Sequence, residues 1–290
     1  MLVRTAALAV FAAAAARTQS IPASADATSL ALVDAQYENS GLNDGGNAGF
    51  GIDLEAAAIL SVVYPSFGVV ENGQTYTVDQ VTDAPDVFVT PSEETATWFN
   101  SSSRYTLTLA DASSLGDPDT RGNYRHFLGN SLTGAAASGS NLTFEPADGT
   151  VITSYAAPGP IEGTGPHRYA WLLFTQPENF QAPSNLSSTA SAAPWYVSDY
   201  VAQTGIQLVA ASFFTVQNGD PTGSVASTQA VNTATLSVSS AASSGASSSG
   251  SQTASSASPS STGGGNGAST LALSSAAGVF AAVAGVAAML

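Results

Sequence analysis

The chain has 290 residues, and its 21 acidic side chains against six arginines and no lysine give a formal net charge of −15. A surface this acidic excludes nucleic acid as a partner and excludes electrostatic adsorption to anionic lipid. There is no cysteine, which excludes disulfides and thiolate metal sites, so the fold must be stabilised by packing alone.

Residues 1–20 have the pattern of a secretory signal peptide. A basic residue, Arg4, precedes an apolar run from Ala6 to Ala16 that is too short for a comfortable membrane span. Small residues predict cleavage between residues 16 and 25, either after Ala16 or after Ala25 in an Ala-Ser-Ala sequence. The alternative is a buried N-terminal helix.

Residues 27–218 predict one mainly β domain with a single core. Helical periodicity is weak, and the clearest short helix runs from Ser198 as N-cap to Gly205 as stop. Runs of β-branched and aromatic residues between turn residues predict two packed sheets with a few short helices. These predicted strands or strand fragments are residues 56–67, 74–81, 86–90, 96–100, 104–111, 124–132, 142–146, 150–160, 167–176 and 205–217.

The C-terminal part has two further predicted segments. Residues 219–266, rich in Ser, Thr and Gly, predict a disordered and O-glycosylated stalk. Residues 267–290 end in an uncharged apolar tail, which is the pattern of a GPI-attachment propeptide with Asn266 as the attachment residue. The alternative is a retained membrane helix, but such helices normally carry basic residues on their cytoplasmic side.

Three sequons, at Asn100, Asn141 and Asn185, predict N-glycosylation. Together with the signal peptide and the anchor signal they predict a secreted glycoprotein. We expect it on the extracellular face of the plasma membrane, where a lipid anchor is its one membrane attachment, or in the cell wall.

The basic side chains of the predicted domain are clustered in two short segments. If the two segments meet in the fold, they form the one patch of this acidic domain that attracts an anion. The clustered residues are Arg104, Arg121, Arg125, His126, His167 and Arg168.

Strand alternation predicts which of these side chains point the same way. His167, Tyr169 and Trp171 share one face of the predicted strand 167–176, whereas Arg168 lies on the other.

In the same way His126 is predicted to share a face with Tyr124 and Leu128. A strand that ends at Asp111 brings a carboxylate to the sheet rim, where it would fix the tautomers of two imidazoles or favour imidazolium. Such a group makes a small cavity for a phosphate-like or acetate-like anion. The alternative is that the histidines are hydrogen-bonded core residues and that Asp111 is a turn residue.

Two motifs resemble the phosphatidylethanolamine-binding protein family, which includes Raf kinase inhibitor protein. The family's Gly-x-His-Arg-Tyr signature before an apolar strand appears as GTGPHRYAWLLFTQ at 163–176. Its other signature, a strand into an Asp-Pro-Asp-Ala-Pro loop followed by Arg-x-Trp-x-His, is matched in outline by YTLTLADASSLGDPDTRGNYRHFLGN. Ser113 replaces the second acid, Tyr124 replaces the Trp, and Asp117 falls further along the loop.

The resemblance covers residues 31–217, where ASFFTVQ fits the family's closing segment. It implies a central antiparallel sheet, a second smaller sheet and a small anion pocket at one end. The pocket residues that it implies are Asp111, His126, His167 and Tyr169, with Gly159 and Pro160 as a loop wall.

The resemblance implies a non-enzymatic binding module for a phosphorylated small molecule or a phospholipid headgroup, with no cofactor and no metal. Two alternatives are a serine carboxypeptidase inhibitor, like a yeast homologue, and a surface structural protein with a vestigial pocket. An enzyme is a further alternative, with Ser113 and His126 as nucleophile and base, or Asp111 and two histidines as a metal triad. No catalytic motif supports it.

Overall fold

The protein is described here from a computed structural model. The described residues are 21–45, 49–117, 122–136, 141–144, 149–187 and 190–224, together with 226, 231 and 236. The predicted signal peptide, the predicted anchor propeptide with Asn266, and most of the predicted stalk lie outside these residues.

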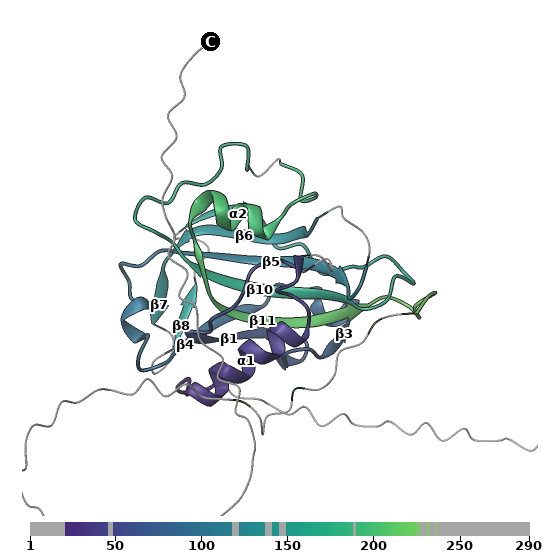
Figure 1. Cartoon of the computed structure of the whole chain (residues 1–290), viewed down its shortest axis with the longest axis horizontal. Helices are drawn as coiled ribbons and strands as arrows, with labels where there is room; N and C mark the ends of the chain where they lie inside the picture. The colour runs from purple at the N-terminus through teal and green to yellow at the C-terminus, as the bar shows by residue number, and fades with distance from the viewer. Residues whose placement is uncertain are drawn as a thin grey trace, which may run out of the picture. The chain divides into compact units, whose positions relative to one another are not determined.

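Two β-sheets form the domain, which confirms the predicted class (Figure 1). Strand β3 runs parallel to β11, and the other pairs are antiparallel. The smaller sheet has the order β2 (Gly68–Val69), β1 (Ala58–Tyr64), β4 (Asp86–Pro91), β8 (Leu142–Phe144), β7 (Gly134–Ala136). The larger sheet has the order β3 (Thr75–Thr77), β11 (Gln207–Gln217), β10 (His167–Thr175), β5 (Tyr105–Ser114), β6 (Tyr124–Leu132), β9 (Thr150–Thr153).

The larger sheet has a hydrophobic core on each face. Tyr169, Trp171 and Leu173 of β10 pack in a cluster with side chains of β1 and β4, so this core lies between the two sheets. Ala170 and Leu172 face the other way and pack with side chains of α1 (Ala27–Asn39) and α2 (Val197–Thr204). Because β10 is buried on both faces, it is almost continuously apolar, and the alternation predicted for it is confirmed.

One of the two α-helices was predicted and the other was not. Helix α1 was not predicted, because only Val33 and Tyr37 of this helix are buried and it has little amphipathic periodicity. Helix α2 ends at Gly205 as predicted, with φ of 69°, but Tyr196 rather than Ser198 occupies its N-cap position. Within the part of the chain that the structure describes, neither helix has the length and apolar character needed to cross a membrane.

Several strand predictions were wrong in whole or in part. Residues 96–100 do not form a strand: a 3₁₀ helix, η3 (Ala96–Trp98), lies there, and the Thr95 carbonyl accepts a hydrogen bond from the Trp98 amide at 2.8 Å. A second short 3₁₀ helix, η2 (Val78–Val81), takes the second half of the predicted strand 74–81, and β9 ends at Thr153 rather than at residue 160. Strand β5 does not end at Asp111 but continues to Ser114, which pairs with His167 of β10.

Candidate functional site

A cavity of about 790 Å³ lies at one end of the larger sheet. Strands β5, β6 and β10 contribute its inner side chains, and two loops, 156–161 and 193–196, form its walls. All six residues that the family resemblance implied for a pocket line it: Asp111, His126, Gly159, Pro160, His167 and Tyr169.

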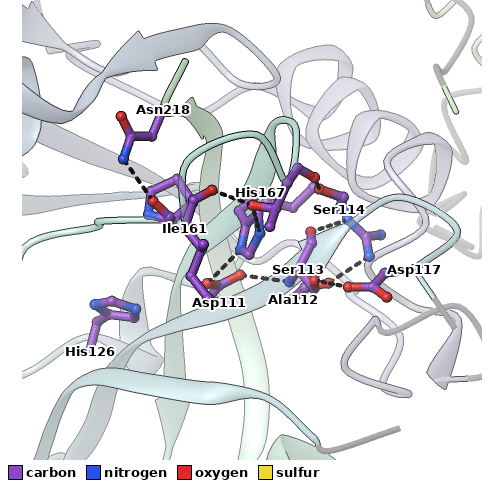
Figure 2. A network of polar contacts seen from close by, with 12 residues as sticks. Asp111, Ala112, Ser113, Ser114, Asp117, His126, Ile161, His167 and Asn218 are labelled. Carbon is purple, nitrogen blue, oxygen red and sulfur yellow. Dashed lines mark hydrogen bonds and ion pairs between the residues drawn. The ribbon is translucent and has the colours of Figure 1, made fainter. Parts of the chain in front are cut away.

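The Asp111 carboxylate holds His167 in place. A β-bulge in β5, between Asp111 and Ser114 and opposite His167 and Tyr169, brings the imidazole beside the carboxylate, and Nδ1 of His167 lies 3.0 Å from Oδ2 of Asp111. The other oxygen, Oδ1, accepts a hydrogen bond from the Ser113 amide at 2.6 Å. Figure 2 shows Asp111 between His167 and Ser113, with His126 to one side. The predicted contact between a carboxylate and an imidazole is therefore present.

Thr164 is a site residue that the sequence analysis missed. Its hydroxyl oxygen lies 2.9 Å from Nε2 of His167, and its O–H donates to the Ile161 carbonyl at 2.7 Å. Ser114 holds the Thr164 backbone from the strand side, because its hydroxyl donates to the Thr164 carbonyl at 2.9 Å. In the sequence, the one indication of this role is weak: Thr164 is a hydroxyl residue three positions before His167 in a glycine-rich loop.

His126 occupies a bulge in β6, and this overturns the prediction that it shares a face with Leu128. The prediction that it shares a face with Tyr124 is confirmed, because both side chains line the cavity. Leu109 pairs with Phe127 while Ala110 pairs with Arg125, so His126 is the extra residue and strand alternation is broken there. Leu128 packs in the core on the opposite face.

His126 is held as a neutral imidazole. Its Nδ1 lies 2.8 Å from the Ala156 carbonyl oxygen, and its ring contacts those of Tyr124 and Tyr169. Burial lowers the pKa of His126, although the Ala156 carbonyl and the Asp111 charge oppose that effect. The Nδ1–H tautomer donates to the carbonyl and leaves Nε2 as an acceptor.

Tyr169 places a hydroxyl in the cavity wall that has no hydrogen-bond partner among the described residues. The residue is fully buried on β10, and its ring meets that of His126 edge-on at 5.2 Å. Burial, with the nearby Asp111 charge, raises the pKa of Tyr169, so its hydroxyl stays protonated and can donate.

The predicted gathering of arginines beside the histidines is wrong for the arginines that the structure describes. Arg104 is exposed before the start of β5, at the opposite end of that strand from Asp111. Arg125 is buried on the other face of the sheet, where it donates to Thr153 at 2.6 Å and lies over the Trp195 ring. Arg121 lies outside the described residues.

Arg168 is also directed away from the cavity. Its guanidinium donates to four backbone carbonyls at 2.7–3.2 Å. Burial lowers its pKa to about 10, so it remains charged at neutral pH. Its four acceptors are the carbonyls of Ser40, Gly41, Ala112 and Ser113.

The geometry does not support the nucleophile or metal alternatives. The Ser113 hydroxyl donates to the Asp117 carboxylate rather than to His126. Within the described ranges, no group of three His, Asp or Glu side chains is arranged to hold a metal ion.

Comparison with known proteins identifies the family. Residues 69–214, just over half of the chain, match the family model of the phosphatidylethanolamine-binding protein. The chain belongs to this family. It is 24% identical to the uncharacterised Saccharomyces cerevisiae protein YLR179C over 176 residues, which cover 57% of this chain and 84% of the yeast protein.

Solved structures with the same fold include a carboxypeptidase Y inhibitor in complex with its cognate proteinase. The likeness has a TM-score of 0.51 at 21% identity and covers 63% of this chain and 93% of the inhibitor. A phosphatidylethanolamine-binding protein from Plasmodium falciparum has a TM-score of 0.46 at 14% identity, with 63% of this chain and 95% of that one covered.

One departure from the family signature has a structural counterpart. Ser113 stands where the family pattern has a second acid, and it adopts a positive φ of 56°. The Asp117 carboxylate, further along the loop, accepts the Ser113 hydroxyl (Figure 2). An acid therefore does reach Ser113, although Asp117 does not line the cavity.

The mouth of the pocket is apolar and was not predicted. Tyr124, Ile161 and Tyr196 line the cavity although they are 45%, 73% and 42% exposed. Gly122 packs under the Tyr196 ring with a φ of 82°, a left-handed conformation that favours glycine. Exposed apolar side chains around a pocket are typical of binding surfaces.

The three sequons differ in accessibility. Asn100 and Asn185 are exposed, as a glycan requires. Asn141 is buried, and its side-chain carbonyl accepts the Thr90 hydroxyl at 2.9 Å. A glycan on Asn141 would have to displace that contact, so the expectation of glycosylation is stronger at the other two sequons.

Proposed function

We propose that this family member is a non-enzymatic binding module whose pocket holds a small phosphoryl or other oxyanion headgroup. The group would come from a phosphorylated small molecule or from a phospholipid. Support comes from family membership and from the convergence of two histidines, one tyrosine and one aspartate in a single cavity.

The buried Tyr169 hydroxyl carries this proposal. A buried hydroxyl without a partner costs about 1–3 kcal/mol, and proteins rarely retain one without a reason. A ligand oxygen in the cavity would accept this hydroxyl. Asn218 supports the loop wall, because its side-chain amide donates to the Pro160 carbonyl at 3.1 Å.

The test is a thermal shift with added O-phosphoethanolamine. A ligand that binds only the folded protein raises Tm, by an amount that corresponds to about 2.7 kcal/mol at a hundredfold excess over Kd. Tyr169→Phe removes only the hydroxyl, so we expect it to fold and to lose most of the shift.

Tyr37→Phe is the matched control, because Tyr37 also has a buried hydroxyl without a partner among the described residues but lies away from the cavity. An unchanged shift in Tyr169→Phe, or an equal loss in both variants, would contradict the assignment.

Serine carboxypeptidase inhibition is the second candidate. The observation that favours it is the fold shared with the carboxypeptidase Y inhibitor over 93% of that inhibitor's length. The recombinant domain should inhibit such a peptidase in the micromolar range or below if this role applies. Full peptidase activity at micromolar protein would dismiss it.

Display at the cell surface is part of the proposal. The sequence patterns at residues 1–20 and 267–290 support it, with residues 219–266 as the stalk. A phosphatidylinositol-specific phospholipase should release the protein from intact cells. Retention after complete digestion would instead favour a spanning helix or a covalent cell-wall linkage.

A further inference from the structure

The two pocket histidines differ in how many of their ring nitrogens contact protein groups, and this difference limits which ligands the pocket accepts. Both nitrogens of His167 contact groups of the protein, namely Asp111 and Thr164. His126 has one engaged nitrogen, Nδ1, at the Ala156 carbonyl. The inference below rests on the proposed binding function and concerns what the bound group must be.

Both nitrogens of His167 are already engaged by the protein. The Asp111 carboxylate only accepts, so Nδ1 of His167 donates to it. Nε2 lies 2.9 Å from the Thr164 hydroxyl oxygen. His167 therefore has no N–H left for a ligand.

His126 and Tyr169 give the inner part of the cavity one further acceptor and one further donor. His126 donates from Nδ1 to Ala156, so its Nε2 is a lone-pair acceptor. Tyr169 has the buried hydroxyl without a partner among the described residues, and that hydroxyl donates. An anion without a proton would satisfy Tyr169 but would place a lone pair against Nε2 of His126.

The charges that face His126 give no net attraction for a dianion. Asp111 of β5 places its carboxylate beside His167 of β10, and the groups that contact the His126 ring are the phenol rings of Tyr124 of β6 and Tyr169 of β10. The two wall loops contribute no charged side chain to the cavity lining. Of the arginines that the structure describes, Arg125 and Arg168 lie on the other face.

We propose that the pocket selects the protonated form of an oxyacid, with one ligand O–H donating to Nε2 of His126 and a second oxygen accepting from Tyr169. A phosphomonoester monoanion has both groups. A phosphodiester, such as a phospholipid headgroup, has no O–H and is bound only when the proton resides on His126 instead. In both cases binding takes up one proton from solution at neutral pH.

Calorimetry on the unmodified protein tests this with two probes, O-phosphoethanolamine as the monoester and glycerophosphoethanolamine as the diester. Titrations near pH 7 in two buffers of different ionisation enthalpy measure the number of protons taken up. We expect about one proton for each ligand and tighter binding of the monoester, whose second pKa is near 6. Its affinity should fall about tenfold per pH unit above that value.

Binding of either probe without proton uptake would overturn the inference and leave the proposed function intact. Absence of binding at every pH, for both probes, would instead overturn the proposed function. His126→Gln gives a second measurement, because an amide N–H can replace the missing proton. This variant should bind the monoester with a pH dependence much weaker than the wild type, and an unchanged pH dependence would contradict the role of His126.

Nitrogen NMR provides an independent check, because the chain has only two histidines and one variant assigns both. Near pH 7 the free protein should show His126 with one protonated nitrogen, Nδ1. Thr164→Val removes the hydroxyl at Nε2 of His167 and should change the His167 signals alone. A proton on both nitrogens of His126 in the free protein would overturn the inference.

Discussion

The two faces of the larger sheet carry side chains from the same two histidine–arginine pairs, but these side chains have different roles on each face. Each of two strands that flank β5 contains an adjacent basic pair, Arg125-His126 in β6 and His167-Arg168 in β10. In both pairs the histidine lines the cavity, while the arginine lies on the face that α1 and α2 cover. One sequence feature thus supplies a candidate binding site on one face and structural cross-links on the other.

The two faces differ in which hydrogen-bonding groups already have a partner within the protein. Arg168 directs its guanidinium to four carbonyls from two parts of the chain, so it has a structural role. The cavity face instead retains a free acceptor on His126 and a free hydroxyl on Tyr169 among the described groups. A basic residue in the sequence therefore does not locate an anion site; the groups left without partners do.

The largest loss of stability should come from Arg168→Met, which removes a guanidinium from the face of the sheet that α1 and α2 cover. Methionine fills similar volume but leaves four carbonyls without their donor, so we expect a loss of roughly 4 kcal/mol of unfolding free energy. Urea denaturation measures it. Arg104→Met is the control, since exposed Arg104 contacts only nearby serine carbonyls, and we expect a change below about 0.5 kcal/mol. Equal losses in both variants would contradict the structural role of Arg168.

Much of this division follows from the sequence. Alternation along 167–176 predicted that His167 and Tyr169 share a face and that Arg168 lies on the other. This is confirmed, because the bulge at this end of the sheet adds its extra residue to β5 and leaves the alternation of β10 intact. The motif resemblance predicted the six pocket-lining residues, and all of them line the cavity.

The remaining features depend on contacts that no local pattern encodes. Alternation failed at His126 because a bulge inserts one residue, and a bulge has no sequence signal without glycine. The role of Thr164 depends on where a loop packs against β10. Clustering of Arg125 and Arg168 near the histidines in sequence did not predict their direction, because adjacent strand residues point to opposite faces.

An intermediate effect is expected from Arg125→Met on the same structural face. Arg125 donates to Thr153 and, at 3.4 Å, to the Ser191 carbonyl, and it lies 5.3 Å from the Trp195 ring centroid. Fewer groups lose a partner than with Arg168, so we expect a loss of about 2 kcal/mol in urea denaturation. The affinity for O-phosphoethanolamine should be unchanged in the folded variant. Lost affinity with retained stability would place Arg125 in the ligand site and contradict its structural role on the helix-covered face.

The smallest effect concerns the pH dependence of stability on the cavity face. Burial lowers the pKa of His126 below its unfolded value of about 6.5, so the unfolded chain binds the proton more readily. The stability that neutral His126 contributes to the folded protein is therefore fully present above about pH 6.5 and is lost as the pH falls below that value. Between pH 7 and pH 5.5 the wild type should lose on the order of 1 kcal/mol more than His126→Gln.

Urea denaturation of both proteins in phosphate-free buffer measures this difference. His167 is present in both proteins, and the carboxylates titrate mainly below this range, so their contributions largely cancel in the comparison. A parallel loss in the two proteins would mean that His126 is not held neutral by its surroundings. In that case the cavity would already contain a protonated His126 at neutral pH, and binding of a phosphomonoester would need no proton from solution.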